Sequence, residues 1–326
     1  MPHRHSSFRP AWWLPGAHLQ TIWPTLFRHR PALPLEKERI NLEDGDFLDL
    51  AWLGKDNDAP LVLLLHGLEG SVNSSYAKGL MQALQQAGYA VCFMHFRGCS
   101  GEPNRLDRSY HSGDTGDLQQ VVRHIRQQHQ REIYAAVGFS LGGNVLLKWL
   151  GEQGTSAPVA CAVAVSVPYL LDDAAQRMNR GLSRVYQRHL VSRLQRKYRQ
   201  KFSHRQPPLA VDVGKLNTFY QFDDEVTAPL HGFEGVADYY QRSSSRQYLP
   251  GITVPTLLIH AIDDPFMFPE TVPDNAELPE NVTLELSQQG GHVGFVTGAW
   301  PWRARYWVDE RVIEWLGEKL KRREAT

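Results

Sequence analysis

A regular alternation of short apolar segments and longer helical segments between residues 59 and 168 constrains the fold most. The apolar segments are rich in Val, Ala and Leu, as strands buried on both faces are. The expected strands lie at 59–67, 89–98, 132–139 and 159–168, and the expected helices at 74–88, 115–128 and 141–154. Strands and helices that alternate at these lengths form right-handed β-α-β crossovers and a parallel sheet. The sequence therefore predicts an α/β fold whose ligand site lies beyond the carboxyl ends of the strands.

The segments on either side of this alternation complete the expected architecture. Residues 37–53 alternate around Asp44-Gly45, which predicts an antiparallel hairpin. After residue 168 a polar, helical segment without clear strands interrupts the alternation. Strands at 253–264 and 281–295 resume it, and an amphipathic helix at 307–323 closes the chain. We therefore expect a core of residues 1–168 and 251–326, with an N-terminal arm at 1–36, and a helical cap inserted at 169–250.

Composition excludes several classes of function. The 326 residues carry 35 basic and 35 acidic side chains, and a net charge of +0 gives no reason to expect nucleic acid as a partner. Three cysteines, Cys92, Cys99 and Cys161, lack metal-ligand spacing and fit core packing in a reducing compartment. The N-terminus has no apolar signal region, and no run is apolar and long enough to span a bilayer. We expect a cytoplasmic protein with neither a cofactor nor a metal ion.

The stretch Gly138-x-Ser140-x-Gly142 joins an expected strand to an expected helix. A turn this tight strains the serine backbone, and glycine on both flanks avoids collision with the neighbouring chain. The hydroxyl is then exposed, close to the first free N–H groups of the helix. In its strand and helix context, this pattern indicates a nucleophile elbow with Ser140 as the nucleophile.

A serine hydroxyl needs a base to take its proton and an acid to orient that base. Asp264 ends one late expected strand, with Asp263 as the neighbouring alternative, and His292 follows the next strand on two glycines. The resulting chain order is serine, acid, histidine. The other candidates are more distant acids in the inserted segment and a histidine expected to be buried in a strand: Asp223, Asp224, Glu225 and His260.

The loop after the first expected parallel strand is the second part of the predicted site. His66-Gly67 turns the chain there, so that the N–H of Leu68 can point toward Ser140. Together with the N–H of Leu141, it would form the oxyanion hole of an acyl-transfer site.

Five short motifs and the opening segment carry a family resemblance. "HGLEG", "FRGCSG", "GFSLGGN", "AIDDPF" and "GGHVGF" together resemble the α/β-hydrolase superfamily. With "LPGAHLQTIWP", the chain resembles more narrowly the hydrolase-domain family that contains YheT, plant embryogenesis-associated proteins and yeast ethyl ester synthases. The resemblance runs nearly end to end and implies a triad of Ser140, Asp264 and His292. Within it, Asp264 before Pro265 occupies the place of the acid.

The inserted segment is where substrate preference should be decided. Residues 177–202 contain no acidic side chain and carry an apolar stripe made of Leu182, Val185, Tyr186, Leu190, Leu194 and Tyr198. We expect this stripe to face the site and the basic residues to face water, with weak docking to a membrane surface as the alternative. Trp12, Trp13 and Trp23 are expected to fasten the N-terminal arm, or alternatively to line an acyl pocket.

These observations predict a serine hydrolase that acts on carboxylic esters with an apolar or acyl part, through an acyl-enzyme. The expected partner is a small-molecule ester. The alternatives are acyl transfer to an alcohol, lipase-like or phospholipase-like activity at a membrane surface, an aminopeptidase, and a binding protein on a hydrolase scaffold. The intact set of Ser140, His292 and Asp264 argues against the last of these.

Overall fold

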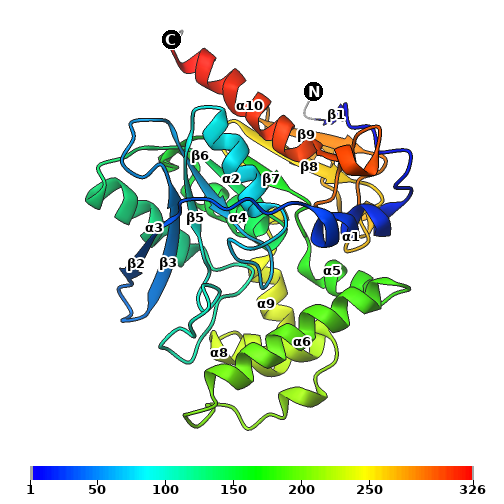
Figure 1. Ribbon diagram of the computed structural model, residues 1–326. Coiled ribbons are helices and arrows are strands. Elements are labelled where there is room, and N and C mark those ends of the chain that lie inside the picture. The colour runs from blue at the N-terminus through cyan, green and yellow to red at the C-terminus, as the bar shows by residue number, and fades with distance from the viewer. Residues whose placement is uncertain (1–2, 325–326) are drawn as a thin grey trace.

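The computed structural model describes residues 3–324 and contains a central sheet of nine strands in the order β1-β9-β8-β7-β6-β4-β5-β3-β2 (Figure 1). The strands from β1 to β5 in this order are mutually parallel, and the hairpin of β3 and β2 adds two antiparallel strands at one edge. The predicted mostly parallel α/β sheet is confirmed. The strands are β1 (His3–His5), β2 (Glu36–Asn41), β3 (Phe47–Leu53), β4 (Leu61–Leu65), β5 (Ala90–Met94), β6 (Ile133–Phe139), β7 (Val159–Val165), β8 (Thr256–Ala261) and β9 (Val282–Ser287).

Helices cover both faces of the sheet (Figure 1). Apolar side chains of α3 (Thr115–Gln128) and α4 (Leu141–Gln153) pack in one core cluster, and those of α2 (Ala77–Gln86) and α10 (Trp307–Glu324) pack in a second one. The inner strands contribute alternate residues to the two clusters, because successive side chains of a strand point to opposite faces. This two-sided burial explains why β4, β6 and β7 read as nearly continuous apolar runs.

The sequence did not predict the two elements that open the chain. β1 pairs in parallel with β9 at the sheet edge, and its three residues are exposed or half-buried, so they show no apolar pattern. α1 (Ala17–Phe27) contains Pro24 and buries only Gln20 and Pro24, which gives it no continuous apolar face. A small antiparallel pair, β10 (Val296–Thr297) and β11 (Arg305–Tyr306), also escaped prediction because each strand has only two residues.

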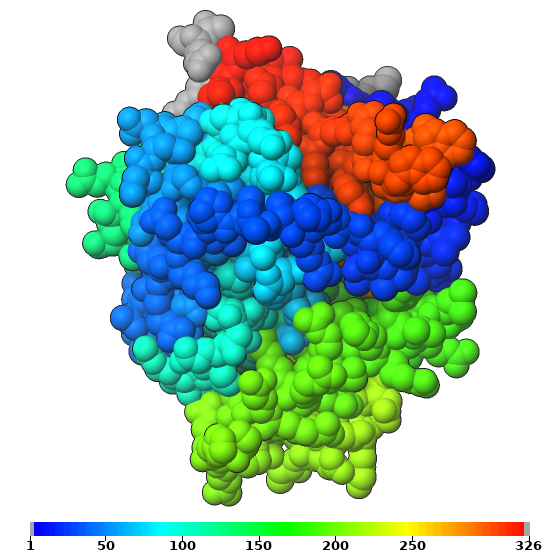
Figure 2. Space-filling view, in the orientation of Figure 1, coloured from blue at the N-terminus to red at the C-terminus, as the bar shows by residue number. Residues whose placement is uncertain are grey.

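Residues 169–250 are all described and contain helices without any strand. The segment leaves the sheet after β7 and returns at β8, and it lies across the carboxyl ends of the parallel strands (Figure 1). In Figure 2 its green and yellow-green atoms form the lower part of the molecular surface, below the blue N-terminal arm. Its helices are α5 (Leu171–Met178), α6 (Ser183–Lys201), α7 (Phe219–Phe222), α8 (Ala228–Leu230) and α9 (Val236–Ser243).

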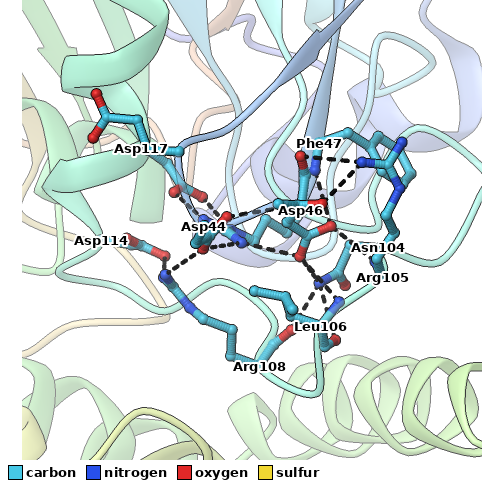
Figure 3. Close-up of polar contacts among 12 residues, drawn as sticks. Asp44, Asp46, Phe47, Asn104, Arg105, Leu106, Arg108, Asp114 and Asp117 are labelled. Atoms are coloured by element: carbon cyan, nitrogen blue, oxygen red, sulfur yellow. Dashed lines mark hydrogen bonds and ion pairs between the residues drawn. The ribbon is translucent and has the colours of Figure 1, made fainter.

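A buried polar cluster holds the loop between β5 and α3 against the β2–β3 hairpin (Figure 3). The guanidinium of Arg97 binds both carboxylate oxygens of Asp117, at 2.6 and 2.7 Å, and one oxygen of Asp46 at 3.0 Å. Burial disfavours the charge of Asp46, but hydrogen bonds from Asn104, from two backbone N–H groups and from Arg97 outweigh it and lower the pKa of Asp46. The loop is therefore fixed where it approaches the inserted segment.

Candidate active site

Ser140 lies between the end of β6 and the start of α4, where the sequence places the elbow. Its backbone has φ 50° and ψ −119°, a strained conformation for a residue with a side chain. A Cβ atom at Gly138 would lie 2.5 Å from the carbonyl oxygen of Gly142, and one at Gly142 would lie 2.5 Å from the carbonyl oxygen of His66. Both positions therefore require glycine because the backbone approaches closely there, as the sequence pattern predicts.

The structure brings Ser140, His292 and Asp264 together in one hydrogen-bonded chain. His292 Nε2 lies 3.0 Å from Ser140 Oγ, and His292 Nδ1 lies 2.9 Å from Asp264 Oδ2. The Asp264 side chain is 1% exposed and that of His292 is 10% exposed, so solvent competes little for these bonds. The three side chains come from loops at the carboxyl ends of β6, β8 and β9, which meet at one edge of the sheet.

Asp264 and Asp263 have different partners in the loop after β8. Asp264 Oδ1 accepts a hydrogen bond of 2.8 Å from the N–H of Phe266, which leaves Oδ2 for the imidazole. The Phe266 ring stacks on His292 with centroids 4.0 Å apart and planes 8° apart, so it restrains the imidazole plane. Asp263 Oδ1 instead accepts from the N–H of Gly291 at 2.9 Å and holds the loop that carries His292.

Among residues 3–324, the other candidate acids and the strand histidine form no hydrogen bond with these three side chains. Asp223 accepts hydrogen bonds from the hydroxyls of Thr227 and Tyr240, Asp224 accepts from a backbone N–H, and Glu225 is exposed. His260 is buried inside β8, and burial lowers its pKa to about 4.

The loop after β4 passes directly beside Ser140. A Cβ atom on Gly67 would lie 3.3 Å from Ser140 Cβ. The buried His66 holds this turn, because Nε2 accepts from the N–H of Phe96 at 3.1 Å, which leaves Nδ1 to donate to the carbonyl oxygen of Gly67 at 2.7 Å. Burial lowers the pKa of His66 to about 3, so its imidazole stays neutral and keeps both bonds.

The predicted oxyanion donors lie in this turn and at the start of α4. The N–H groups of Gly67 and Glu69 donate to the hydroxyls of Tyr76 and Tyr110, at 2.8 and 2.7 Å. Among residues 3–324, the intervening N–H of Leu68 has no hydrogen-bond partner. Leu141 is the first residue of α4, so its N–H is one of those that lack an intrahelical acceptor. Both residues line the cavity next to Ser140.

Helix α6 holds the same loop through Glu69, which is buried and has a φ of 53°. Lys197 Nζ lies 3.0 Å from Glu69 Oε1, which also accepts from the Tyr110 hydroxyl at 2.9 Å. The guanidinium of Arg193 donates to the backbone carbonyl of Glu69. The expectation that basic residues of this helix face water is therefore wrong for Lys197. Arg193 is exposed as a whole, but its guanidinium also bonds Glu69.

The apolar stripe of the inserted segment is also only partly correct. Tyr186, Leu190, Leu194 and Tyr198 line the cavity, but Leu182 and Val185 are 64% and 65% exposed. Helix α6 therefore turns a mixed face toward the site, with Lys201 inside as well. Lys201 Nζ donates to Asn104 Oδ1 at 2.8 Å and to the carbonyl oxygen of Arg108, and burial lowers the pKa of Lys201 to about 7.

The N-terminal arm supports the loop that carries His292, which sequence reasoning missed. Thr21 Oγ1 of α1 donates to the carbonyl oxygen of Ala17 at 2.7 Å and accepts from the N–H of His292 at 2.9 Å. The next N–H, that of Val293, donates to Ser166 Oγ at 3.0 Å. The buried amide of Gln20 bonds both the N–H and the carbonyl of Val296. The opening segment "LPGAHLQTIWP" places Gln20 and Thr21 among apolar residues, and this pattern alone does not indicate their contacts with the loop of His292.

The tryptophans of the arm act as anchors rather than as cavity walls. The indole N–H groups of Trp12 and Trp13 donate to the carbonyl oxygens of Ala299 and Gly298, each at 3.0 Å. Trp23 packs against Trp13 with centroids 4.7 Å apart. The expectation that they fasten the arm is confirmed, whereas the alternative acyl pocket is wrong, because none of them lines the cavity.

A cavity of about 720 Å³ opens beside Ser140 and His292. The core loops, α1 and the inserted segment all contribute to its wall. Apolar side chains line much of it, including Ile22, Met178, Leu190, Leu194 and Leu230. Arg193, Lys197 and Lys201 form a polar strip along α6. The volume is in the range of small-molecule sites, so a ligand with a sizeable apolar part fits next to the serine.

Comparison with known proteins agrees with this fold. The chain belongs to the family described as alpha/beta hydrolase fold, which matches residues 60–299. It is 41% identical over 322 residues to "Putative esterase YheT" of Escherichia coli (strain K12), covering 97% of this chain and 94% of that protein. It is 30% identical to "Embryogenesis-associated protein EMB8" of Picea glauca, covering 97% of this chain and 72% of that protein. It is 29% identical to "Phospholipase ABHD3" of Mus musculus, covering 92% of this chain and 76% of that protein.

Solved structures of the same fold include an esterase of Pyrococcus furiosus, Pf2001. It superimposes with a TM-score of 0.57 at 19% identity, over 89% of this chain and 93% of that one.

In residues 3–324 no helix is both long and apolar enough to cross a membrane.

Proposed function

We propose that this protein is a carboxylic ester hydrolase in which Ser140 is the nucleophile, His292 the general base and acid, and Asp264 the residue that orients the imidazole. The observation that carries the proposal is the hydrogen-bonded chain from Asp264 through His292 to Ser140, at the wall of a largely apolar cavity. Family membership and a relative named as an esterase support the same reaction class.

The reaction would begin when Ser140 Oγ bonds to the ester carbonyl carbon while its proton passes to His292 Nε2. Asp264, acting on the Nδ1–H, stabilises the imidazolium that forms. The carbonyl oxygen becomes negative and accepts hydrogen bonds from the N–H groups of Leu68 and Leu141. One such donor is worth about 10²–10³ in rate, so the position of the loop after β4 matters as much as any side chain.

The two products leave in turn, the alcohol at the end of acylation and the acid after hydrolysis of the acyl-enzyme. The bond between the carbonyl carbon and the alcohol oxygen breaks, and the alcohol leaves with the proton from His292, which leaves an acyl group on Ser140. A water molecule then gives a proton to His292 and attacks the acyl carbon. Collapse of that intermediate returns the proton to Ser140 and frees the carboxylic acid. No cofactor is required for either half.

The substrate we propose is an ester with an acyl chain or another extended apolar part. The apolar wall of the cavity supports this, and so do relatives named as a phospholipase and as a monoacylglycerol lipase. We propose that residues 169–250 act as a cap that forms one wall of the acyl site, because α6 supplies Leu190 and Leu194 to the cavity.

We also propose weak docking to an anionic membrane surface through the exposed apolar side chains of Leu182 and Val185 on α6. Helix α6 contacts α1 where His18 lies 3.0 Å from the Tyr186 hydroxyl, and α1 exposes two further apolar side chains, Leu26 and Phe27. Arg184 and Arg188 of α6 are also exposed. Replacing Leu182 and Val185 by Ser should reduce sedimentation with phosphatidylglycerol vesicles and leave soluble-ester kinetics unchanged. Undiminished sedimentation of that variant would contradict the proposal. A cytoplasmic location is proposed because Cys92, Cys99 and Cys161 form no disulfide among the described residues.

A fluorophosphonate probe tests the central proposal. We expect it to label Ser140 in the wild-type protein and to block hydrolysis of p-nitrophenyl esters. Ser140→Ala should fold normally, because the hydroxyl lies at the cavity wall, and should lose both labelling and nearly all turnover. Ser203→Ala, at an exposed serine, is the matched control and should retain both. Wild-type turnover by Ser140→Ala would show that Ser140 is not the nucleophile.

A further inference from the structure

Three potential metal ligands meet on the outer side of the β2–β3 hairpin, apart from the site around Ser140. Glu38 lies in β2, His124 in α3, and His129 directly after α3. His124 Nε2 is 2.7 Å from Glu38 Oε1, and His129 Nε2 is 3.0 Å from the same oxygen. One donor atom from each residue lies within 4.8 Å of the other two. Among residues 3–324, no other group of three or more histidine, cysteine or acidic side chains has its donor atoms this close together.

The donor set matches the preferences of zinc. Zn²⁺ binds imidazole nitrogen and carboxylate oxygen at about 2.0–2.2 Å in a tetrahedral arrangement, which separates the donor atoms by about 3.3 Å. The two distances from Glu38 Oε1, 2.7 and 3.0 Å, would have to lengthen to this value, and each histidine donor lies within 4.8 Å of the other. The three side chains are between 17% and 26% exposed, so an ion would be partly shielded yet accessible from solvent. Three protein ligands leave a fourth position for water.

Neighbouring side chains orient the carboxylate for this role. The indole N–H of Trp52 donates to Glu38 Oε2 at 2.9 Å, and Lys55 Nζ lies 3.2 Å from the same oxygen. Oε1 faces both imidazoles, and His129 Nε2 also lies 3.0 Å from Oε2, so these outer partners hold the whole carboxylate beside the two histidines.

We propose that Glu38, His124 and His129 bind one Zn²⁺ ion. None of the three residues lines the cavity beside Ser140. The ion would join the hairpin at the sheet edge to the end of α3 and stabilise this edge of the fold. Each imidazole must present Nε2 without its proton to the ion, so the ion would replace the hydrogen bonds that now join the histidines to Glu38.

Lys55 provides a test that a purely structural ion-pair cluster would not pass. Its ammonium repels a divalent cation at Glu38, so Lys55→Gln should tighten zinc binding by threefold or more while all three ligands remain. If Glu38 serves only to pair with Lys55 and the two histidines, the same change removes an ion pair and creates no affinity for zinc.

The experiment uses the full chain after treatment with EDTA and titrates ZnCl₂ against a chromophoric chelator. We expect one equivalent to bind to the wild-type protein and to raise its melting temperature. Glu38→Gln and His129→Gln should each weaken binding at least tenfold, whereas His204→Gln, at an exposed histidine, should leave it unchanged. Circular dichroism of the metal-free variants checks that they fold.

Two results would overturn the proposal. One is a wild-type protein that binds zinc no more tightly than Glu38→Gln. The other is a Lys55→Gln protein, which keeps every ligand, whose affinity equals or falls below that of the wild type. Neither readout depends on ester hydrolysis, so failure of the proposed enzymatic activity would leave this test unaffected.

Discussion

The hydrogen bond between Thr21 and the backbone of His292 makes the N-terminal arm part of the site. Thr21 Oγ1 accepts from the His292 N–H at 2.9 Å. Thr21→Val keeps the shape of the side chain but removes this acceptor, so the His292 N–H loses its partner in the folded protein. Thr21→Ser keeps the hydroxyl and is the matched control.

The size of the effect follows from the desolvation of that N–H. A buried donor without an acceptor costs about 1–3 kcal/mol. If the loop moves to avoid this cost, His292 leaves its position 3.0 Å from Ser140 Oγ. Were the whole cost expressed in the transition state, kcat would fall by about 5-fold to 150-fold, since about 1.4 kcal/mol corresponds to a factor of ten. The same loss should appear in the rate of fluorophosphonate labelling.

The assay measures kcat and KM for p-nitrophenyl butyrate together with the labelling rate and the melting temperature. We expect Thr21→Val to lower kcat with a smaller change in KM, and Thr21→Ser to stay within about threefold of the wild type. Equal kcat values for Thr21→Val and the wild type would refute the reasoning. An equal loss in Thr21→Ser would show that the methyl group, and not the hydrogen bond, is what matters.

Four further outcomes are expected. Asp264→Asn should reduce kcat far more than Asp263→Asn, because only Asp264 contacts the imidazole; the reverse order in ester kinetics would reassign the acid. Lys197→Met leaves Glu69 without its cation, so it should lower the free energy of unfolding, measured by urea unfolding, by up to about 3 kcal/mol. It should also lower kcat in ester kinetics. An unchanged stability would contradict the ion pair. Leu194→Ser should flatten the dependence of kcat/KM on acyl chain length, where each CH₂ contributes up to about 0.8 kcal/mol or fourfold; an unaltered slope would place the acyl chain elsewhere. Burial lowers the pKa of Lys201 to about 7, so the folded state binds fewer protons than the unfolded state between pH 7 and about 10. The stability of the wild type relative to Lys201→Met should therefore rise with pH across that window, and a flat difference in urea unfolding would contradict the burial of this amine.

The amino-acid sequence by itself determined the features that depend on short-range physics. The strand and helix periods from residue 59 to 168 predicted the parallel sheet, because burial on two faces leaves a continuous apolar run. The glycines around Ser140 predicted the strained turn, because only glycine tolerates the close backbone approach seen there. Asp44-Gly45 predicted the hairpin for a similar local reason. Each of these patterns can be recognised within single strands, helices and turns, without knowing which distant segments meet.

Only the tertiary structure decided which polar side chains turn inward. Lys197 looks like a solvent-facing residue of a basic helix, yet it is partly buried. Its partner Glu69 lies more than 120 residues away in sequence but beside it in space. Likewise, Thr21 meets the backbone of His292 across 271 positions, and Glu38 meets His124 across 86. Periodicity reports only whether a side chain is apolar, whereas a polar side chain can be buried wherever the fold supplies a partner for it.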